Sequence, residues 1–181
     1  MKPARKPSVI LTIGHSNRSW EEFLDLLKAH HVKLLVDVRK MPGSRKNPQF
    51  DRDTLSQALH DAGIDYLHLP GLGGLRRRVA NSPNAGWKNT SFQGYADYML
   101  TPEFEQAIGE LLEQAARSRT AYMCAERVYF RCHRMLVSDW LVAHGHEVFH
   151  IDAEKSAKPH KLMAEARIID GRLIYRGDRL L

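Results

Sequence analysis

The sequence predicts an α/β fold in which strands and helices alternate around a mostly parallel sheet. Short apolar runs rich in β-branched residues recur along the chain, and amphipathic stretches with helix-capping residues lie between them. Glycine or proline ends several of these runs. Because strand-helix-strand connections are right-handed crossovers between parallel strands, we expect a Rossmann-like three-layer sandwich with a mostly parallel five-stranded sheet and a C-terminal hairpin.

The first half of the chain shows the alternation clearly. Residues 9–13 form an apolar run that stops at Gly14, which is typical of a strand buried on both faces. Ser19 and Glu22 form a capping box, and apolar residues at helical spacing follow them. Residues 32–38 repeat the pattern of a buried strand, so the first unit is strand, helix, strand.

The remaining elements follow from the same signals. The glycine-, arginine- and asparagine-rich residues 71–90 have little periodicity, and we expect them to form a long functional loop, such as a lid. The pattern also predicts a helix from about Asp51 to Gly63, a strand over residues 64–69, a helix opened by Thr101 and Pro102, a strand over residues 120–123, a helix over residues 132–144, a strand over residues 148–151, and a hairpin turning at Asp170 and Gly171.

Length and charge limit the classes of protein. A chain of 181 residues fits one domain, so we expect a disordered basic N-terminus over residues 1–8 and a single α/β domain over residues 9–181. The net charge of +6 favours an anionic small molecule or a nucleic acid as partner. Two cysteines without a secretory signal, and no apolar stretch long enough to span a bilayer, predict a cytoplasmic protein with reduced thiols and no membrane contact. The sequence indicates neither a cofactor nor an oligomeric state.

Polar and glycine residues follow each of the first four predicted strands. In α/β sheets of this kind ligands bind beyond the carboxyl ends of the strands, so we expect these residues to share one site. They are His15 and Ser16 after the first strand, Asp37 and Arg39 at the end of the second, Gly73 and Gly74 after the third, and Cys124 and Glu126 after the fourth.

The residue types in this set suggest roles. A thiol at a strand end near arginines, Cys124, is a candidate nucleophile or redox thiol, and Glu126 and His15 are candidate acid and base groups. Asp37 would orient Arg39 as a fork for an anion, although the two can also form a purely structural salt bridge, and Cys124 can be a small buried residue. The candidate substrate-binding residues are Ser16, Arg39, Ser44, Gly73, Gly74, His133 and Arg134.

Five motifs in order along the chain resemble those of domain-of-unknown-function family 488, a group of bacterial and archaeal proteins. The resemblance implies a compact α/β domain whose shared residues are these polar ones, and it implies no particular activity. The motifs are residues 12–16, residues 37–39 with Pro42 and Ser44, residues 72–74, residues 124–126 and residues 132–134.

The sequence favours an enzyme that acts on an anionic substrate bearing phosphate or related to nucleic acid, and Cys124 makes a thiol-dependent enzyme one candidate. One alternative is a non-catalytic nucleic-acid or nucleotide binding module in which Trp87, Phe92 and Tyr95 stack on bases. Another is a metal-binding protein, since cysteine and histidine suit zinc or iron. Its ligands would be His15, Cys124, Cys132 and His133.

Overall fold

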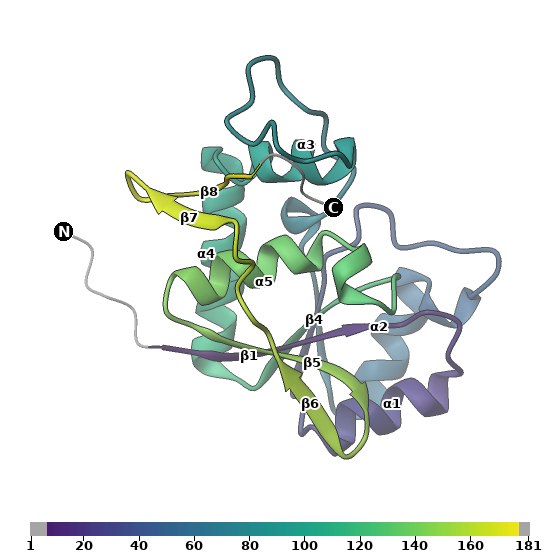
Figure 1. The fold of residues 1–181 in the computed structure, drawn as a ribbon. Coiled ribbons are helices and arrows are strands. Elements are labelled where there is room, and N and C mark those ends of the chain that lie inside the picture. Colours follow the sequence, from purple (N-terminus) through teal and green to yellow (C-terminus); the bar gives the residue numbers. More distant parts are fainter. Residues whose placement is uncertain (1–6, 178–181) are drawn as a thin grey trace.

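A computed structural model describes residues 7–177, so residues 1–6 of the predicted N-terminal segment lie outside the described part. Its centre is a six-stranded sheet in the order β3-β2-β4-β1-β5-β6 (Figure 1). The strands are β1 Val9–Gly14, β2 Leu34–Asp37, β3 Asp65–His68, β4 Thr120–Cys124, β5 Glu147–Ala153 and β6 Ser156–Pro159. A separate two-stranded hairpin consists of β7 Ala166–Ile169 and β8 Arg172–Tyr175.

Helices cover both faces of this sheet (Figure 1). The helices α1 Trp20–Ala29 and α2 Arg52–Asp61 lie on one face, and α4 Pro102–Arg117 and α5 Arg134–Ala143 lie on the other. The short helix α3 Thr90–Tyr98 also belongs to the α4 and α5 side, and short 3-10 turns occur at Pro48–Phe50, Pro70–Leu72 and Tyr129–Arg131. Within residues 7–177, no helix combines the length and the apolar character that crossing a bilayer requires.

The sheet separates two hydrophobic cores because alternate residues of a strand point to opposite faces. In β1, Leu11 and Ile13 pack with Phe23 of α1 in one core. Ile10 belongs to the other core, which also contains Leu111 of α4. This alternation decides which of the predicted site residues can meet.

The predicted α/β class, the mostly parallel sheet and the C-terminal hairpin are confirmed. Five strands, β3, β2, β4, β1 and β5, run parallel, but the sheet has six strands because β6 pairs antiparallel with β5. Ser156–Pro159 is short, polar and ends in proline, so no apolar run marks it as a strand. The order β3-β2-β4-β1-β5 differs from the Rossmann order 3-2-1-4-5-6, and the Rossmann-like part of the prediction is not confirmed.

The long loop after β3 is held against α3 by hydrogen bonds. Asp97 of α3 accepts hydrogen bonds from Ser82 and Asn84, and Tyr95 Oη donates to Leu72 O over 2.6 Å. The sequence analysis did not predict α3. The one helix signal there is the capping residue Asn89, and the polar and apolar residues that follow it show no clear helical periodicity. The three aromatics proposed for base stacking are core residues, since Trp87, Phe92 and Tyr95 are 4%, 8% and 1% exposed; that part of the binding-module hypothesis is wrong.

A buried carboxylate anchors the C-terminal segment to α5. Asp139 is fully buried and accepts hydrogen bonds from His160 Nε2 at 2.8 Å, from Met163 N at 3.1 Å and from Tyr175 Oη at 3.0 Å. His160 Nδ1 in turn lies 2.9 Å from His150 Nε2 on β5. One carboxylate therefore fixes the β7-β8 hairpin and the segment before it against the main domain.

Gly14 ends β1 where two backbones approach closely. A Cβ atom at Gly14 would lie 1.9 Å from Glu126 O and 2.7 Å from Arg127 Cα, so only glycine permits the loop after β4 to cross there. The same loop carries the candidate acid Glu126, and Gly14 therefore determines where the loop lies.

Replacing Gly14 by alanine should destabilise the protein by about 3 kcal/mol, because the clash is with main-chain atoms that cannot rotate away. Urea unfolding of the Gly14→Ala variant measures the loss. Gly43→Ala is the matched control, since a Cβ there meets only Asp51 Oδ1 at 3.9 Å. Equal midpoints for the two variants would contradict the assigned role of Gly14.

Candidate functional site

The predicted site residues on β1, β2 and β4 lie at the carboxyl edge of the sheet. Backbone hydrogen bonds join the three strand ends: His15 N donates to Cys124 O at 3.0 Å, Ser16 N to Ala125 O at 2.9 Å and Val38 N to Met123 O at 3.0 Å. The order β2-β4-β1 places the fourth strand between the other two. Chain topology therefore brings these main-chain segments side by side.

Side-chain alternation divides the residues into two clusters on opposite faces of the sheet. The histidine-arginine cluster comprises His15, Asp37, Arg39, Phe50 and Tyr66, and it joins the core formed with α1 and α2. Cys124 packs instead against the core formed with α4 and α5. It belongs to the dithiol cluster, which comprises Cys124, Cys132, His133 and Arg134.

Asp37 and Arg39 form a buried, bidentate ion pair. Arg39 Nε donates to Asp37 Oδ1 at 2.9 Å and Nη2 donates to Oδ2 at 2.7 Å, while Nη2 also donates to Phe50 O at 2.7 Å. Asp37 Oδ2 accepts a further hydrogen bond from Tyr66 Oη. With Nη1 directed to His15, four of the five N–H donors of Arg39 have partners within the protein. The pair thus holds the strand end together, as the structural reading of the sequence allowed.

His15 is neutral and its hydrogen bonds fix its tautomer. Nδ1 lies 2.7 Å from Ser16 O, which can only accept, so Nδ1 carries the proton. Nε2 then accepts from Arg39 Nη1 at 3.2 Å. The ring is 2% exposed and stacks on Phe50 with centroids 4.2 Å apart. Burial lowers the pKa of His15 to about 4, and the adjacent Arg39 lowers it further in the same direction.

The dithiol cluster brings the two cysteines together across the loop that joins β4 to α5. The sulfur atoms of Cys124 and Cys132 and a ring nitrogen of His133 all lie within 4.8 Å of one another, and Cys132 Sγ is 3.5 Å from His133 Nδ1. Cys124 is partly exposed, whereas Cys132 is 5% exposed. The sulfur nearer to solvent is therefore that of Cys124.

The two thiols have opposite acidities. A hydrogen bond from the Cys124 thiol lowers the pKa of Cys132 to about 6, and the Arg134 guanidinium lowers it against the effect of burial. The same hydrogen bond and burial raise the pKa of Cys124 well above its usual range. At neutral pH the pair therefore holds one proton and one negative charge, and its titration belongs to both sulfurs.

Arg134 supplies the positive charge beside this pair. It is 1% exposed, and its Nη1 donates to Thr12 Oγ1 at 2.9 Å while its Nη2 donates to Glu126 O at 2.5 Å and to Arg127 O at 3.2 Å. These acceptors are neutral, and among residues 7–177 the buried Nε has no hydrogen-bond partner. A buried guanidinium requires a negative charge nearby, and the thiolate of Cys132 provides it.

The other predicted site residues lie around these clusters. Glu126 is exposed and accepts from Val128 N, Ser16 Oγ donates to Asn17 Oδ1, and Ser44 Oγ accepts from Lys46 N and Asn47 N. Gly74 packs on His133, since a Cβ there would lie 2.9 Å from His133 Nδ1. Gly73 packs against the start of the loop after β2, where a Cβ would lie 3.2 Å from Lys40 N.

Three of the four residues predicted as a metal alternative come together, because Cys124, Cys132 and His133 form one possible ligand set. His15 lies in the other cluster. A Cys₂His set with an open position suits a zinc-type ion, and His133 Nε2 is buried without a partner among residues 7–177. A divalent cation would displace the shared proton, so two thiolates would face the cation and Arg134, which leaves one positive charge uncompensated.

The sequence reasoning did not find several residues that complete these clusters. Tyr66 and Phe50 complete the coordination of Asp37 and Arg39, and Thr12 receives Arg134. Thr12 lies inside a buried strand, and its hydroxyl is the one polar side-chain group of that strand. This group is the only sequence signal that Thr12 accepts a hydrogen bond from a buried donor such as Arg134. Nothing in the local sequence around Phe50 marks its carbonyl group as an acceptor.

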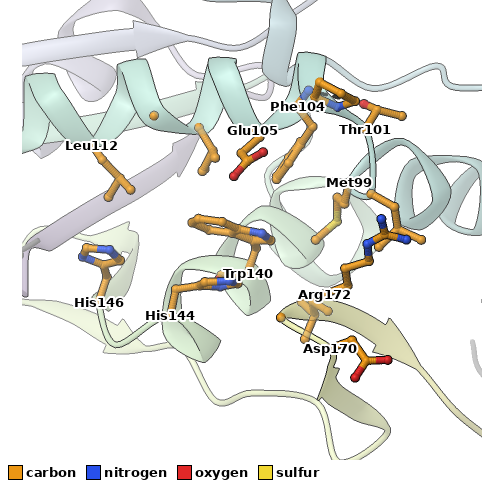
Figure 2. A pocket seen from close by; sticks show the side chains of 16 residues that line it. Met99, Thr101, Phe104, Glu105, Leu112, Trp140, His144, His146, Asp170 and Arg172 are labelled. Carbon is orange, nitrogen blue, oxygen red and sulfur yellow. Dashed lines mark hydrogen bonds between the residues drawn. The ribbon is translucent and has the colours of Figure 1, made fainter. Parts of the chain in front are cut away.

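Two cavities lie near the helices. One, of about 700 Å³, is enclosed by α4, α5 and the β7-β8 hairpin and is lined by Phe104, Trp140, His144 and Arg172 among others (Figure 2). It contains none of the predicted site residues. Another, of about 760 Å³, is lined by Arg18, Arg127 and Asp152 at the ends of β1 and β5. The second cavity adjoins the carboxyl edge.

The fold and the site define an α/β protein with a mostly parallel sheet and two cysteine thiols at its carboxyl edge. A model of the family described as Domain of unknown function DUF488 matches residues 19–141, which is more than half of the chain. The chain belongs to this family, and the resemblance seen in the motifs is confirmed. No curated protein and no solved structure matches the chain.

The buried His15 should make stability depend on pH. Its folded pKa of about 4 lies below the ordinary value of 6.5, so the unfolded chain binds more protons between these values and stability falls as pH falls through this window. The loss should reach about 3 kcal/mol. His15→Gln keeps one donor and one acceptor without a titrating group, so its unfolding free energy should depend less steeply on pH between 6.5 and 4.

Some slope remains in that variant, because burial also lowers the pKa of His150, to about 3. Urea unfolding at a series of pH values measures both proteins. A His15→Gln variant with the same pH slope as the wild type would show that His15 is not held neutral by the fold.

Proposed function

We propose that the protein is a thiol-dependent enzyme that acts on an anionic substrate, with Cys124 as the sulfur that meets the substrate and Cys132 as its partner. The observation that carries this proposal is the buried Arg134, whose charge lowers the pKa of Cys132, together with the sulfur of Cys124 within 4.8 Å of that of Cys132. An electropositive setting of this kind stabilises a thiolate, and the thiolate is the nucleophilic form of cysteine.

The exposures of the two sulfurs assign the roles. Cys132 is 5% exposed and carries the negative charge, whereas Cys124 is partly exposed and carries the proton. A substrate at the carboxyl edge therefore reaches Cys124 first. Before Cys124 attacks the substrate, its proton must pass to Cys132, and the two sulfurs are already in contact.

In the proposed step a bond forms between Cys124 Sγ and an electrophilic atom of the substrate. The Cys124 proton passes to Cys132 Sγ, and the negative charge of the pair moves to Cys124 and from there to the substrate. The bond to the leaving group breaks, the leaving group takes the electron pair, and Cys132 returns the proton to it. His133 lies beside Cys132, with Nδ1 3.5 Å from the sulfur.

The histidine-arginine cluster has a positioning role in this proposal. The hydrogen bonds of Asp37 and Arg39 are directed inward, and both ring nitrogens of His15 have partners. These residues hold the ends of β1 and β2 beside β4. Glu126 is exposed at the turn after Cys124 and is the remaining carboxylate that could exchange protons with solvent or substrate.

The pH dependence of alkylation tests the proposal. After treatment with a chelator, iodoacetamide should modify Cys124 of the folded protein, with a pH-rate midpoint near 6. In Cys132→Ser the pair can no longer share one proton between two sulfurs, so the thiolate of Cys124 loses the hydrogen bond from the Cys132 thiol. The midpoint of Cys124 alkylation should therefore rise toward or above the ordinary thiol value of about 8.5. The midpoint is a better readout than the rate, because a low-pKa thiolate is also a weaker nucleophile.

Peptide mass analysis identifies the modified sulfur. Cys124→Ser is the matched control and should react slowly, since only the buried Cys132 remains. Modification of Cys132 ahead of Cys124, or one common midpoint for wild type and Cys132→Ser, would contradict the assignment.

A further inference from the structure

The positive charge of the protein is concentrated on one edge. The loops that follow β1 to β4 comprise residues 15–19, 38–50, 69–89 and 125–133, and we call them the carboxyl-edge loops. They contain eleven Lys or Arg residues and one acidic residue, Glu126, which is a net charge of +10. Since the whole chain carries +6, the rest of the chain carries −4. The field of the protein therefore attracts anions to this edge.

Some of these cations have partners within the fold. Arg18 and Arg127 both pair with Asp152, Arg39 pairs with Asp37, and Arg76 lies over the ring of Tyr98. The exposed cations that remain come from three of the four loops. They are Lys40, Arg45, Lys46, Arg77, Arg78, Lys88 and Arg131.

These three loops lie next to one another. Lys40 Nζ is 3.5 Å from Leu75 O, which joins the loop after β2 to the loop after β3. Gly74 packs on His133, which joins the loop after β3 to the segment before α5. The loops that carry the exposed cations are therefore in contact with one another.

Each of the three loops also exposes at least one large apolar side chain, and the loop after β3 exposes a second, Val79, at 56%. Met41 is 76% exposed, Leu75 is 74% exposed and Phe130 is 50% exposed. Exposed apolar groups among cations suit a ligand that has both charged and apolar parts. A ligand that covers both kinds of group carries many negative charges and flat apolar faces.

We infer that the carboxyl-edge loops bind single-stranded nucleic acid, with the phosphates on the lysines and arginines and bases against Phe130, Met41 and Leu75. Single strands are bound in this way, by a basic track with side chains on which bases stack. A single small phosphate would use only a few of the cations. A duplex keeps its bases inside and would leave the apolar groups uncovered. The inference rests on the proposed function for its anionic substrate and names the class of that substrate.

Fluorescence anisotropy with a labelled oligothymidine of about 16 nucleotides tests this inference. The wild type should bind, and the logarithm of the affinity should fall with the logarithm of salt concentration by about 0.7 per phosphate contact. Arg77→Gln/Arg78→Gln removes two exposed charges, so it should weaken binding and reduce the slope by about 1.4. Lys28→Gln/Lys33→Gln is the matched control; both lysines are exposed outside these loops, and their loss should leave the slope unchanged.

Phe130→Ala separates stacking from charge. It should weaken binding about fivefold or more without changing the salt slope, because a base contact is lost and no phosphate contact is. The anisotropy assay needs no reactive cysteine, so binding is measured independently of the thiol chemistry. Failure of the alkylation test alone would remove the proposed reaction and leave the nucleic-acid surface.

Three results would overturn the inference. They are no binding at low salt, equal losses in Arg77→Gln/Arg78→Gln and Lys28→Gln/Lys33→Gln, and binding to phosphatidylserine vesicles or to a duplex of equal length that is as tight as binding to the single strand. Absence of binding would exclude a polyanion as the ligand. Equal losses in the two double variants would exclude the carboxyl-edge loops as the binding surface. Equally tight binding to vesicles or to a duplex would assign the surface to that partner.

Discussion

The buried guanidinium of Arg134 is the constraint on which the arrangement of the site depends. It joins the start of α5 to β1 through Thr12 and to the loop after β4 through the carbonyl groups of Glu126 and Arg127. A charge buried to this extent must be balanced, and the guanidinium lowers the pKa of the Cys132 thiol. Arg134 therefore holds the loop in place, and the hydrogen bond from Cys124 together with the Arg134 charge favours the thiolate of Cys132.

The order of elements could be predicted from the sequence because each signal was local. Buried strands such as residues 9–13 are short and apolar, and the capping box of Ser19 and Glu22 forms as predicted. The meeting of the strand ends at one edge could also be predicted, because the carboxyl ends of parallel strands lie at the same edge of a sheet. β6 and α3 lack such signals: β6 is polar, and α3 has buried residues on several sides, including Gln93 and Asp97, which hides its periodicity.

The division of the site into two clusters could not be predicted in the same way. It depends on which face of the sheet each strand end presents, and a shift of one residue would exchange the faces. Asp37 and Arg39 share a face because they are two residues apart, but their inward hydrogen bonds depend on Tyr66 and the carbonyl group of Phe50, which come from other elements. The low pKa of Cys132 likewise depends on Cys124, eight residues away and across a loop.

The shared proton of the dithiol is tested most directly by titrating the ultraviolet absorbance of thiolate in the folded, reduced wild-type protein. One of the two thiols should ionise with a midpoint near 6, and the second should remain protonated well above the ordinary thiol range, because Arg134 balances one negative charge and not two. Two thiols that ionise together near their ordinary pKa would contradict the account, since Arg134 would then not be paired with a thiolate.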